Sequence, residues 1–574
     1  MCIFPAFLQT AVEGMWGKRT KEFEKNQEPP ERRFRSNIGE VFFDNALSAE
    51  RVQSLIDGAK AAGCQHLESL ATKTTTRCKN RRINRDLVRR FTKHCMWPGL
   101  YWAIVRVWDT KTQQIAKVRL PMLLPHEVLS VLAKYNDISD TSGMTKQCWE
   151  HLCAMRTKSN HPEALAIGFW MDGVPCNWDR KRTMECFSWN LPGLSNDKKK
   201  LRIPLTIIEK RYVAAEVTFN DILEVLAWSM VWLAEGKHPL RRHDNTEFTL
   251  QEDNDRKKKA GTALGCFGFL CELRGDWALL KNTLHLAGWN DADCCFRCNI
   301  KKTNIAQFNS DSPWRKPENR RDHWSNLAQM LRDGHQPSAL FKCPGFRTEL
   351  IAIDWLHCCD LGVAADFLGN LLTVVVKQQP GSNISERIRS LFVKLQTWYT
   401  ANKVTDRLQV LTEGMLRKKP SYSPKLRAYA AEVRALVPFA EYISAELDNA
   451  NIVHNTIKQA AKHLHKCYLN LSSGNFSSIS LKTEAIKFCT LYGALQEDAE
   501  RSGLVAWRVK PKFHLFLEMT MEGHNPSLNW TYRDEDFGGS VAAVSRSKGG
   551  PSVIQCTAAR YLMRFRAKHR VFFY

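Results

Sequence analysis

The sequence predicts a mixed α/β (α+β) protein in which an α/β core is interrupted by a large all-helical region and preceded by a smaller, mainly helical region. Two observations predict this class: strand-like apolar runs between residues 101 and 277, and helical periodicity from residue 383 to about residue 503. The chain has 574 residues, 44% of them hydrophobic, so it can bury several compact units and is not a disordered protein. Apolar runs such as Val225–Ala234 are too short to span a bilayer, so we expect no membrane association.

The first 135 residues predict an arm followed by a basic, DNA-binding region. Residues 1–35 are polar and charged and contain a Pro-Pro pair, which predicts a flexible arm. Residues 36–98 show helical spacing and then a dense basic run, which predicts a small helical unit. Two β-rich runs around residues 109–112 predict a hairpin, and Pro125–Tyr135 predicts a helix. We group residues 36–135 as one N-terminal region.

Residues 160–299 predict the first part of the α/β core. Ala164–Met171 is a continuous apolar run, which predicts a buried strand that ends at a turn beginning with Asp172. Two further strands and a helix follow, at Cys186–Leu191, Leu201–Ile208 and Thr218–Gly236. A fourth strand, Cys266–Leu273, runs into Arg-Gly-Asp276. Three strands, a helix and a fourth strand, with an aspartate after the first and the fourth, is the element order of the ribonuclease-H-like fold.

Residues 300–505 predict a helical insertion into that core. The part from 300 to 345 is polar and contains prolines, which predicts irregular structure, whereas residues 383–503 predict a helical bundle. Residues 506–574 return to mixed character. We assign them to the last part of the core, with a third acidic residue and a basic C-terminal tail.

Charge is the strongest compositional signal. The chain carries 83 Lys and Arg against 59 Asp and Glu, a formal net charge of +24, which attracts polyanions and indicates a nucleic-acid partner. The candidate phosphate contacts in the first basic run are Arg77, Lys79, Arg81, Arg82, Arg85, Arg89 and Arg90. A second run closes the chain, at Arg560, Arg564, Arg566, Lys568 and Arg570. Either run alone is equally typical of a solvated helix face.

Three acidic residues are candidates for phosphoryl-transfer chemistry. Two-metal catalysis needs carboxylates from different elements that converge on ions about 3.5–4 Å apart. Asp172 and Asp276 stand at predicted strand ends, although Asp-Gly and Gly-Asp are also common turn dipeptides. For the third acid we choose Glu535, in an acidic triplet that is also typical of an exposed helix N-terminus. If Glu535 lies far from the other two, the replacements are Asp534, Asp536 and Glu518.

The nineteen cysteines indicate reduced thiols, some of them holding metal, rather than a disulfide framework. Cys295 and Cys298 form a C-x₂-C pair nineteen residues after Asp276. His514, with Glu518 or His524, would complete a structural zinc site closing a loop of about 220 residues. A competing set of ligands is His357, Cys358 and Cys359. We interpret that segment instead as a buried helix.

Together these features resemble the cut-and-paste DDE/D DNA transposases, in particular the CACTA type and the Transib type that gave rise to the V(D)J recombinase catalytic subunit. The resemblance covers roughly residues 160–545 and includes the Lys-Pro-Lys-x-His sequence at 510–514. It implies a catalytic triad of Asp172, Asp276 and Glu535 that holds Mg²⁺ or Mn²⁺, and zinc ligands Cys295, Cys298 and His514. The chain departs from those families at their second histidine, where Glu518 has the nearest equivalent spacing and His524 lies further on.

The resemblance implies a transposase that cleaves and joins double-stranded DNA, both transposon ends and target, in the nucleus and as a homo-oligomer on DNA. The alternative is a domesticated, catalytically inactive DNA-binding protein with the same scaffold. A third hypothesis is a ribonuclease-H-like nuclease of repair or RNA processing. The chain has no G-x-x-x-x-G-K-[ST] loop, no G-x-S-x-G and no H-E-x-x-H, so neither ATP use nor serine or zinc proteolysis is supported.

Overall fold

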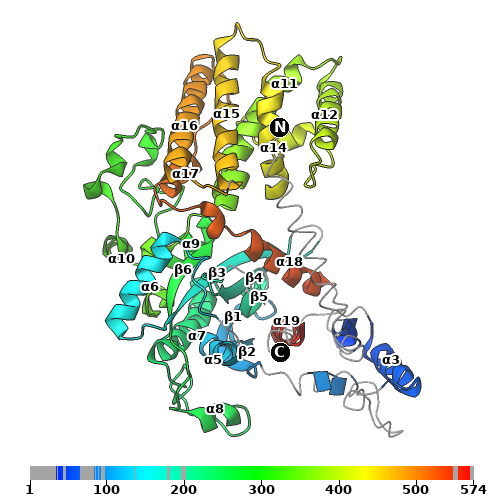
Figure 1. Ribbon diagram of the computed structural model, residues 1–574, viewed down its shortest axis with the longest axis vertical. Helices are drawn as coiled ribbons and strands as arrows, with labels where there is room; N and C mark the ends of the chain where they lie inside the picture. The colour runs from blue at the N-terminus through cyan, green and yellow to red at the C-terminus, as the bar shows by residue number, and fades with distance from the viewer. Residues whose placement is uncertain are drawn as a thin grey trace.

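A computed structural model gives the fold (Figure 1). It describes residues 97–546 apart from 136–137, 178–180, 195–201 and 473, together with 47–64, 554–568 and a few residues between 34 and 91. The predicted flexible arm therefore lies almost entirely outside the described residues.

The central sheet has four strands, and all four predicted strands are confirmed. They are β3 (Leu165–Pro175), β4 (Thr183–Asn190), β5 (Ile203–Glu209) and β6 (Gly268–Gly275). The strand order is β5-β4-β3-β6, with β3–β4 and β4–β5 antiparallel and β6 parallel to β3. Beyond β6, Ile351 forms an isolated parallel bridge to Leu273, which extends the sheet by one further short segment.

The first strand continues past the turn that the sequence predicts. Asp172 pairs with Cys186 and Pro175 with Thr183, so the Asp-Gly-Val-Pro segment belongs to the β3–β4 ladder. The ladder hydrogen bonds override the local turn preference of Asp-Gly, as tertiary context commonly does. Asp172 is therefore held on a rigid strand rather than on a loop.

The two faces of the sheet are covered by different helices. On one face, Ala166 packs under α6 (Lys146–Ser159), and Trp170 lies edge-to-face with Phe537 of α18 (Tyr532–Arg546). On the opposite face lies α7 (Ala215–Glu235), which ends as predicted at Gly236 with φ +67°. Asp172 alternates with Ala166 and Trp170 along β3, so its side chain points to the face that α18 covers.

The predicted hairpin and the helix that follows it are both confirmed. They are β1 (Tyr101–Asp109), β2 (Gln114–Met122) and α5 (Pro125–Tyr135). The backbone amide of Leu123 donates to the carbonyl of Leu205 at 2.9 Å, so the hairpin lies beside β5 and shares the main hydrophobic core. By contrast, α3 (Ala49–Ala61) contributes Val52 and Ile56 to a separate small core. The packing of the N-terminal region is thus divided between two cores.

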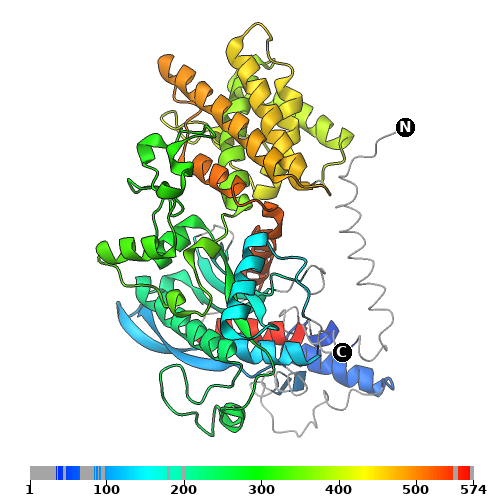
Figure 2. The ribbon, with the colours of Figure 1, turned by 60° about the vertical axis from the view of Figure 1, so that its left-hand side comes forward.

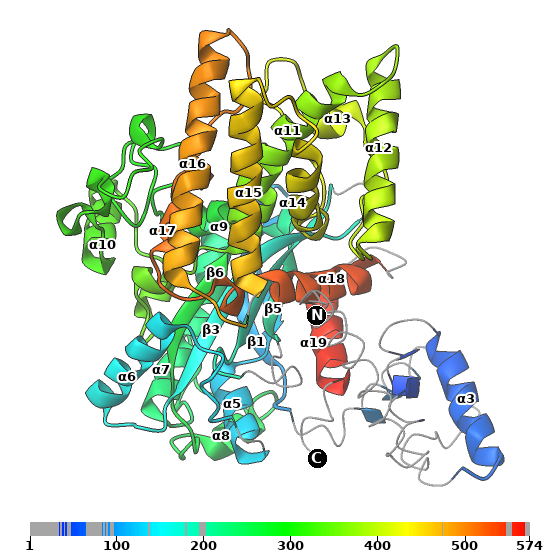
Figure 3. The ribbon, with the colours of Figure 1, turned by 45° about the horizontal axis from the view of Figure 1, so that its top comes forward.

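The helical bundle is also confirmed and lies at one end of the molecule, at the top of the view in Figure 1 and of that in Figure 3. Its helices are α11 (Ala365–Gln378), α12 (Ile384–Ala401), α13 (Glu413–Leu416), α14 (Ala430–Ser444), α15 (Ile452–Ser472) and α16 (Ser478–Arg501). Residues 300–345 are irregular as predicted, apart from α10 (His323–Arg332) and short 3₁₀ turns.

Between the bundle and the sheet run α17 (Pro511–Thr520) and the start of α18 (Figure 2). The remaining helices are α8 (Asn254–Lys259), α9 (Trp277–Leu284) and α19 (Ile554–Lys568). Two helices of the described residues, α7 and the continuous helix Leu356–Gln378, are long and apolar enough to cross a membrane, although much of their surface is buried against other elements. Core helices of globular proteins share that property.

Candidate functional site

Two of the three predicted acids meet although 363 residues separate them in the chain. Asp172 comes from β3 and Glu535 from the first turn of α18, and His357 lies between them. The His357 Nε2 atom is 3.7 Å from Asp172 Oδ2 and 3.8 Å from Glu535 Oε1. One ligand atom from each residue lies within 4.8 Å of the other two, so these three side chains can share one metal ion. We call them, with Asp276, the carboxylate site.

Asp276 belongs beside this group because of the strand register. Gly275, the last residue of β6, pairs with Met171 of β3, and the residue that follows each of them is an aspartate, which places Asp276 beside Asp172. Asp276 is also the N-cap of α9, where Oδ1 accepts from the amide of Leu279 at 2.5 Å. Asp276 therefore caps a helix, in keeping with the turn role that the sequence suggested, and it also lies beside Asp172.

Burial and mutual repulsion oppose ionisation of the site's acids. Burial, followed by the charges of Asp276 and Glu535, raises the pKa of Asp172 well above its usual value against the opposing effect of His357. Burial also raises the pKa of Glu535. Carboxyls with strongly shifted pKa values cluster at functional sites, and a cation bound beside them would favour their ionised form.

His357 is a residue of the site that the sequence did not indicate as a partner of the acids. Its helix, Leu356–Ala364, is a π-helix and is buried as predicted, but the His357 ring points out of it to the acids. Nδ1 lies 2.6 Å from Asp354 Oδ2. Burial would lower the pKa of His357, but the hydrogen bond with Asp354 and the surrounding carboxylates raise it to about 9. Asp354 lies just before the helix and its carboxylate accepts from the backbone amides of Leu356 and His357. An acid placed three residues before His357 at a helix start was the signal available in the sequence.

Asp354 also fixes the start of α18. Its two carboxylate oxygens accept from the backbone amide of Thr531 at 2.9 Å and from the Thr531 hydroxyl at 2.7 Å. The next residue, Tyr532, donates its hydroxyl to the buried Asp360 at 2.7 Å, and Tyr468 of the bundle donates to the same carboxylate at 2.6 Å. The helical bundle and the π-helix together hold the turn that carries Glu535.

Asp534 is excluded as a free third acid by its contacts. Its side chain is fully buried, Oδ1 lies 2.5 Å from Nε of Arg202, and Oδ2 lies 3.1 Å from Nε of Arg274 on β6. Asp534 thus pins α18 to the sheet, while its neighbour Glu535 faces the site. Asp536 is exposed on the same helix and is not among the clustered ligands of the described residues.

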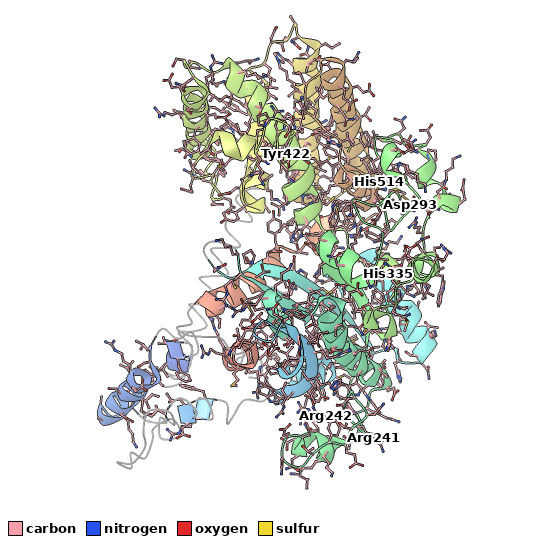
Figure 4. All side chains as sticks on the ribbon, turned by 180° about the vertical axis from the view of Figure 1, so that it is seen from behind. Arg241, Arg242, Asp293, His335, Tyr422 and His514 are labelled. Carbon is pink, nitrogen blue, oxygen red and sulfur yellow. The ribbon has the colours of Figure 1, made fainter. Side chains whose placement is uncertain are left out.

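The Cys-x₂-Cys pair meets the His514 helix as expected. Cys295, Cys298, His514 and Glu518 are all buried, and one ligand atom from each lies within 4.8 Å of the others. Cys298 Sγ and Glu518 Oε1 each lie 3.3 Å from His514 Nε2, and Cys295 Sγ is 3.8 Å from Glu518 Oε1. Such separations suit the corners of a tetrahedron with ligand distances of about 2.0–2.3 Å, which are those of zinc. Figure 4 shows His514 where the helical bundle meets the rest of the chain.

His524 is not part of this cluster. Its Nε2 faces the Asn529 side chain at 3.3 Å and the Glu522 carboxylate at 3.5 Å. Glu518, one helical turn after His514, occupies the fourth position and is also bound by Arg320 through both oxygens at 2.8 Å. Two thiolates, one carboxylate and Zn²⁺ would leave one negative charge, which the Arg320 guanidinium balances.

The described part of the chain includes little of the first basic run. Arg77, Lys79, Arg81, Arg82, Arg85 and Arg89 lie outside the described residues. Arg90 is described and half-buried. In the second run, Arg560, Arg564 and Arg566 lie on α19, and Arg566 donates to the carbonyl of Trp97 at 3.2 Å. At least this arginine therefore has a structural contact.

Comparison of the chain with models of protein families and with curated proteins finds no match.

Proposed function

We propose that the chain is a cut-and-paste DNA transposase that cleaves and transfers DNA strands through Asp172, Asp276 and Glu535. The observation that carries the proposal is the convergence of Asp172 and Glu535 at the carboxylate site, with Asp276 beside Asp172 in the parallel strand register. Two acids from separate elements meet on one face of the sheet, and a third follows the neighbouring strand end. Metal-dependent phosphodiester chemistry needs carboxylates that converge in this way from different elements.

The sheet supports a ribonuclease-H-like core for this function. Three antiparallel strands in the order β5-β4-β3, then a parallel β6 and the parallel bridge at Ile351, follow the strand order of that fold. The helical bundle falls between this core sheet and α18 in the chain, as a helical insertion would. We propose that residues 300–505 are that insertion.

The residues of the carboxylate site fit a hard divalent ion. Asp172, Asp276 and Glu535 offer the carboxylate oxygens that Mg²⁺ and Mn²⁺ prefer, and no thiol lies in the described cluster. The bound ion would stabilise the charge that develops on the phosphodiester oxygens. Within the chain, the strand β3 and the Asp534 ion pairs orient the acids. His357, held by Asp354, carries the positive charge that balances them before an ion enters.

The Cys295, Cys298, His514 and Glu518 cluster fits a structural zinc. The donor chemistry and the separations suit Zn²⁺, and no open position is needed because all four side chains are buried. A zinc there would tie the segment after Asp276 to α17, close to the helix that carries Glu535. We propose that it fixes the distance between these two parts of the active centre.

The partners follow from the charge and the reaction. The net charge of +24 suits double-stranded DNA, both the transposon ends and the target, and such a protein would work in the nucleus. Joining two ends requires two active centres, so we propose a homo-oligomer on DNA.

The test is cleavage of duplex DNA carrying the sequences that flank the gene, with Mg²⁺ or Mn²⁺. We expect wild-type cleavage, and loss of at least about 1000-fold in Asp172→Asn, Asp276→Asn and Glu535→Gln, because each removes a ligand charge. Glu247→Gln, at an exposed glutamate, is the matched control and should cleave normally. DNA binding without cleavage in either metal would refute the enzyme and favour the domesticated DNA-binding protein. Preferred cleavage of RNA-containing duplexes would favour the nuclease.

A further inference from the structure

A cavity of about 1000 Å³ opens directly beside the carboxylate site. Asp276 and His357 line it, and so do four lysines. Lys302 is one of them, and the other three are Lys425, between α13 and α14, and Lys510 and Lys512 at the start of α17. The role proposed for the carboxylates does not use these lysines. Their positions indicate which kind of ligand the cavity can bind.

Two of the ammonium groups are held by the π-helix beside the site. Lys512 Nζ donates to the carbonyl of His357 at 2.6 Å, and Lys425 Nζ donates to the carbonyl of Leu361 at 2.8 Å. A Cβ on Gly362 would lie 2.7 Å from Cδ of Lys512, so the glycine leaves the space in which this lysine crosses the helix. An ammonium group has three N–H donors, so each lysine keeps donors for a further acceptor.

Carboxylates line the cavity together with the lysines, among them Asp354, Asp366 and Glu500. Lys510 pairs with the buried Asp366 at 2.5 Å, but no ion pair of Lys425 or Lys512 exists among the described residues. Burial, and then the charges of Lys512 and Lys510, lower the pKa of Lys425 to about 8 despite the opposing effect of Asp366. Cations gathered in a half-buried cavity repel one another, and an anion that enters it would relieve this repulsion.

The size and the aromatic lining of the cavity restrict the anion. A volume near 1000 Å³ encloses a few nucleotides, whereas a duplex, whose major groove alone is about 12 Å wide, does not fit. Trp277 and Trp289 also line the cavity with ring centroids 5.8 Å apart, and Trp289 is 39% exposed. An exposed indole is a stacking platform for an unpaired base.

We propose that this cavity binds unpaired nucleotides of a DNA strand next to the carboxylate site, with strand phosphates on Lys425 and Lys512 and a base against Trp289. The inference rests on the proposed function, because it names the part of the DNA substrate that lies beside the carboxylates. It gives the lysines a role in holding a strand that has separated from its partner.

The experiment measures binding of a labelled oligothymidylate of about 10 nucleotides to the full chain by fluorescence anisotropy, without added Mg²⁺ or Mn²⁺ and over a range of salt concentrations. For Lys425→Met with Lys512→Met we expect about tenfold weaker binding and a salt slope smaller by about 1.4, because each single-strand phosphate that is no longer neutralised lowers the slope by about 0.7. Trp289→Ala should weaken binding about tenfold with an unchanged slope, because stacking releases no counterion. Lys462→Met, at an exposed lysine of α15, is the matched control and should match wild type.

Three outcomes would overturn the inference. The first is an unchanged affinity and salt slope in a double variant whose thermal unfolding matches wild type. If the double methionine variant unfolds at a lower temperature than wild type, the test uses Lys425→Arg with Lys512→Arg. This variant keeps both positive charges, so its salt slope should equal that of wild type, and a smaller slope would overturn the inference. The second is an equal loss of duplex binding, which would make the lysines part of a duplex groove. The third is competition by thymidine monophosphate as strong as that by the oligonucleotide, which would indicate a free-nucleotide site. The binding assay contains no Mg²⁺ or Mn²⁺, so its result does not depend on cleavage. If wild type binds the oligonucleotide as expected but does not cleave DNA when the metal is added, only the proposed function is refuted.

Discussion

Two neighbouring acids of α18, Asp534 and Glu535, should respond in opposite ways to neutralisation. Asp534 is fully buried and contacts Arg202 at 2.5 Å and Arg274 at 3.1 Å. Arg274 also pairs with Glu272, whereas Arg202 has no second ion pair among the described residues. Asp534→Asn therefore leaves the buried Arg202 guanidinium without a counter-charge.

The magnitude follows from that contact set. Removing one partner of a buried ion pair costs about 3–5 kcal/mol, because the remaining charge stays out of water. We expect Asp534→Asn to lower the free energy of unfolding by about 4 kcal/mol. Burial, together with the charges of Asp354 and Asp534, already raises the pKa of Glu535 against the effect of His357. Glu535→Gln removes a disfavoured charge, so its cost should stay within about 1 kcal/mol.

The assay is urea unfolding of wild type and both variants at neutral pH without added Mg²⁺ or Mn²⁺, followed by tryptophan fluorescence and circular dichroism, together with the cleavage assay. Glu535→Gln should be as stable as wild type and inactive. Two results would refute the assignment of Asp534 to structure and Glu535 to chemistry. One is a loss of unfolding free energy below about 1 kcal/mol for Asp534→Asn, and the other is a larger loss for Glu535→Gln than for Asp534→Asn.

Two further predictions concern the zinc cluster and the buried Asp360. Cys298→Ala should reduce the zinc content from about one ion per chain to none and make unfolding insensitive to a chelator, because three remaining ligands leave the site open. The control is Cys64→Ala, at an exposed cysteine. Burial raises the pKa of Asp360 from 3.8 to about 6, despite Arg434 and two tyrosine hydroxyls. The folded state thus binds this proton more tightly than the unfolded state, and the resulting stability, about 3 kcal/mol, is present below about pH 4 and lost as the pH rises through about 6. Asp360→Asn should lack that loss when free energies of unfolding are compared between about pH 4 and 7.

Each of these predictions has a clear contrary result. If Cys298→Ala still holds one zinc ion per chain, the zinc is bound at a site other than the Cys295, Cys298, His514 and Glu518 cluster. A difference in unfolding free energy between wild type and Asp360→Asn that does not vary with pH would show that the buried carboxyl keeps the same proton affinity in both states.

The secondary structure was largely predictable because it depends on residues close together in the sequence. Continuous apolar runs predicted β3 to β6, and helical spacing predicted α5, α7 and the bundle. The exception is instructive: Asp172-Gly-Val-Pro has the composition of a turn, but its backbone pairs with β4 across the ladder. A hydrogen-bonded partner strand outweighs the preference of four residues.

The candidate site was only partly predictable. Strand ends indicated Asp172 and Asp276, and the C-x₂-C spacing indicated Cys295 and Cys298, because these signals lie within a few residues. The choice of Glu535 within a row of three acids was a hypothesis that local sequence could not test. Asp534 and Asp536 are also acids of the same helix, and they differ from Glu535 in the direction in which the helix points their side chains.

The sequence by itself determined the element order, the charge and the chemical types available: acids after strands, a paired thiol and basic runs. Only the tertiary structure decided which of them meet. It placed His357 within 4 Å of Asp172, 185 residues away, chose Glu518 over His524, and turned Asp534 to the arginines and Glu535 to the site. Contacts of this kind depend on packing between distant elements, and no local pattern encodes them.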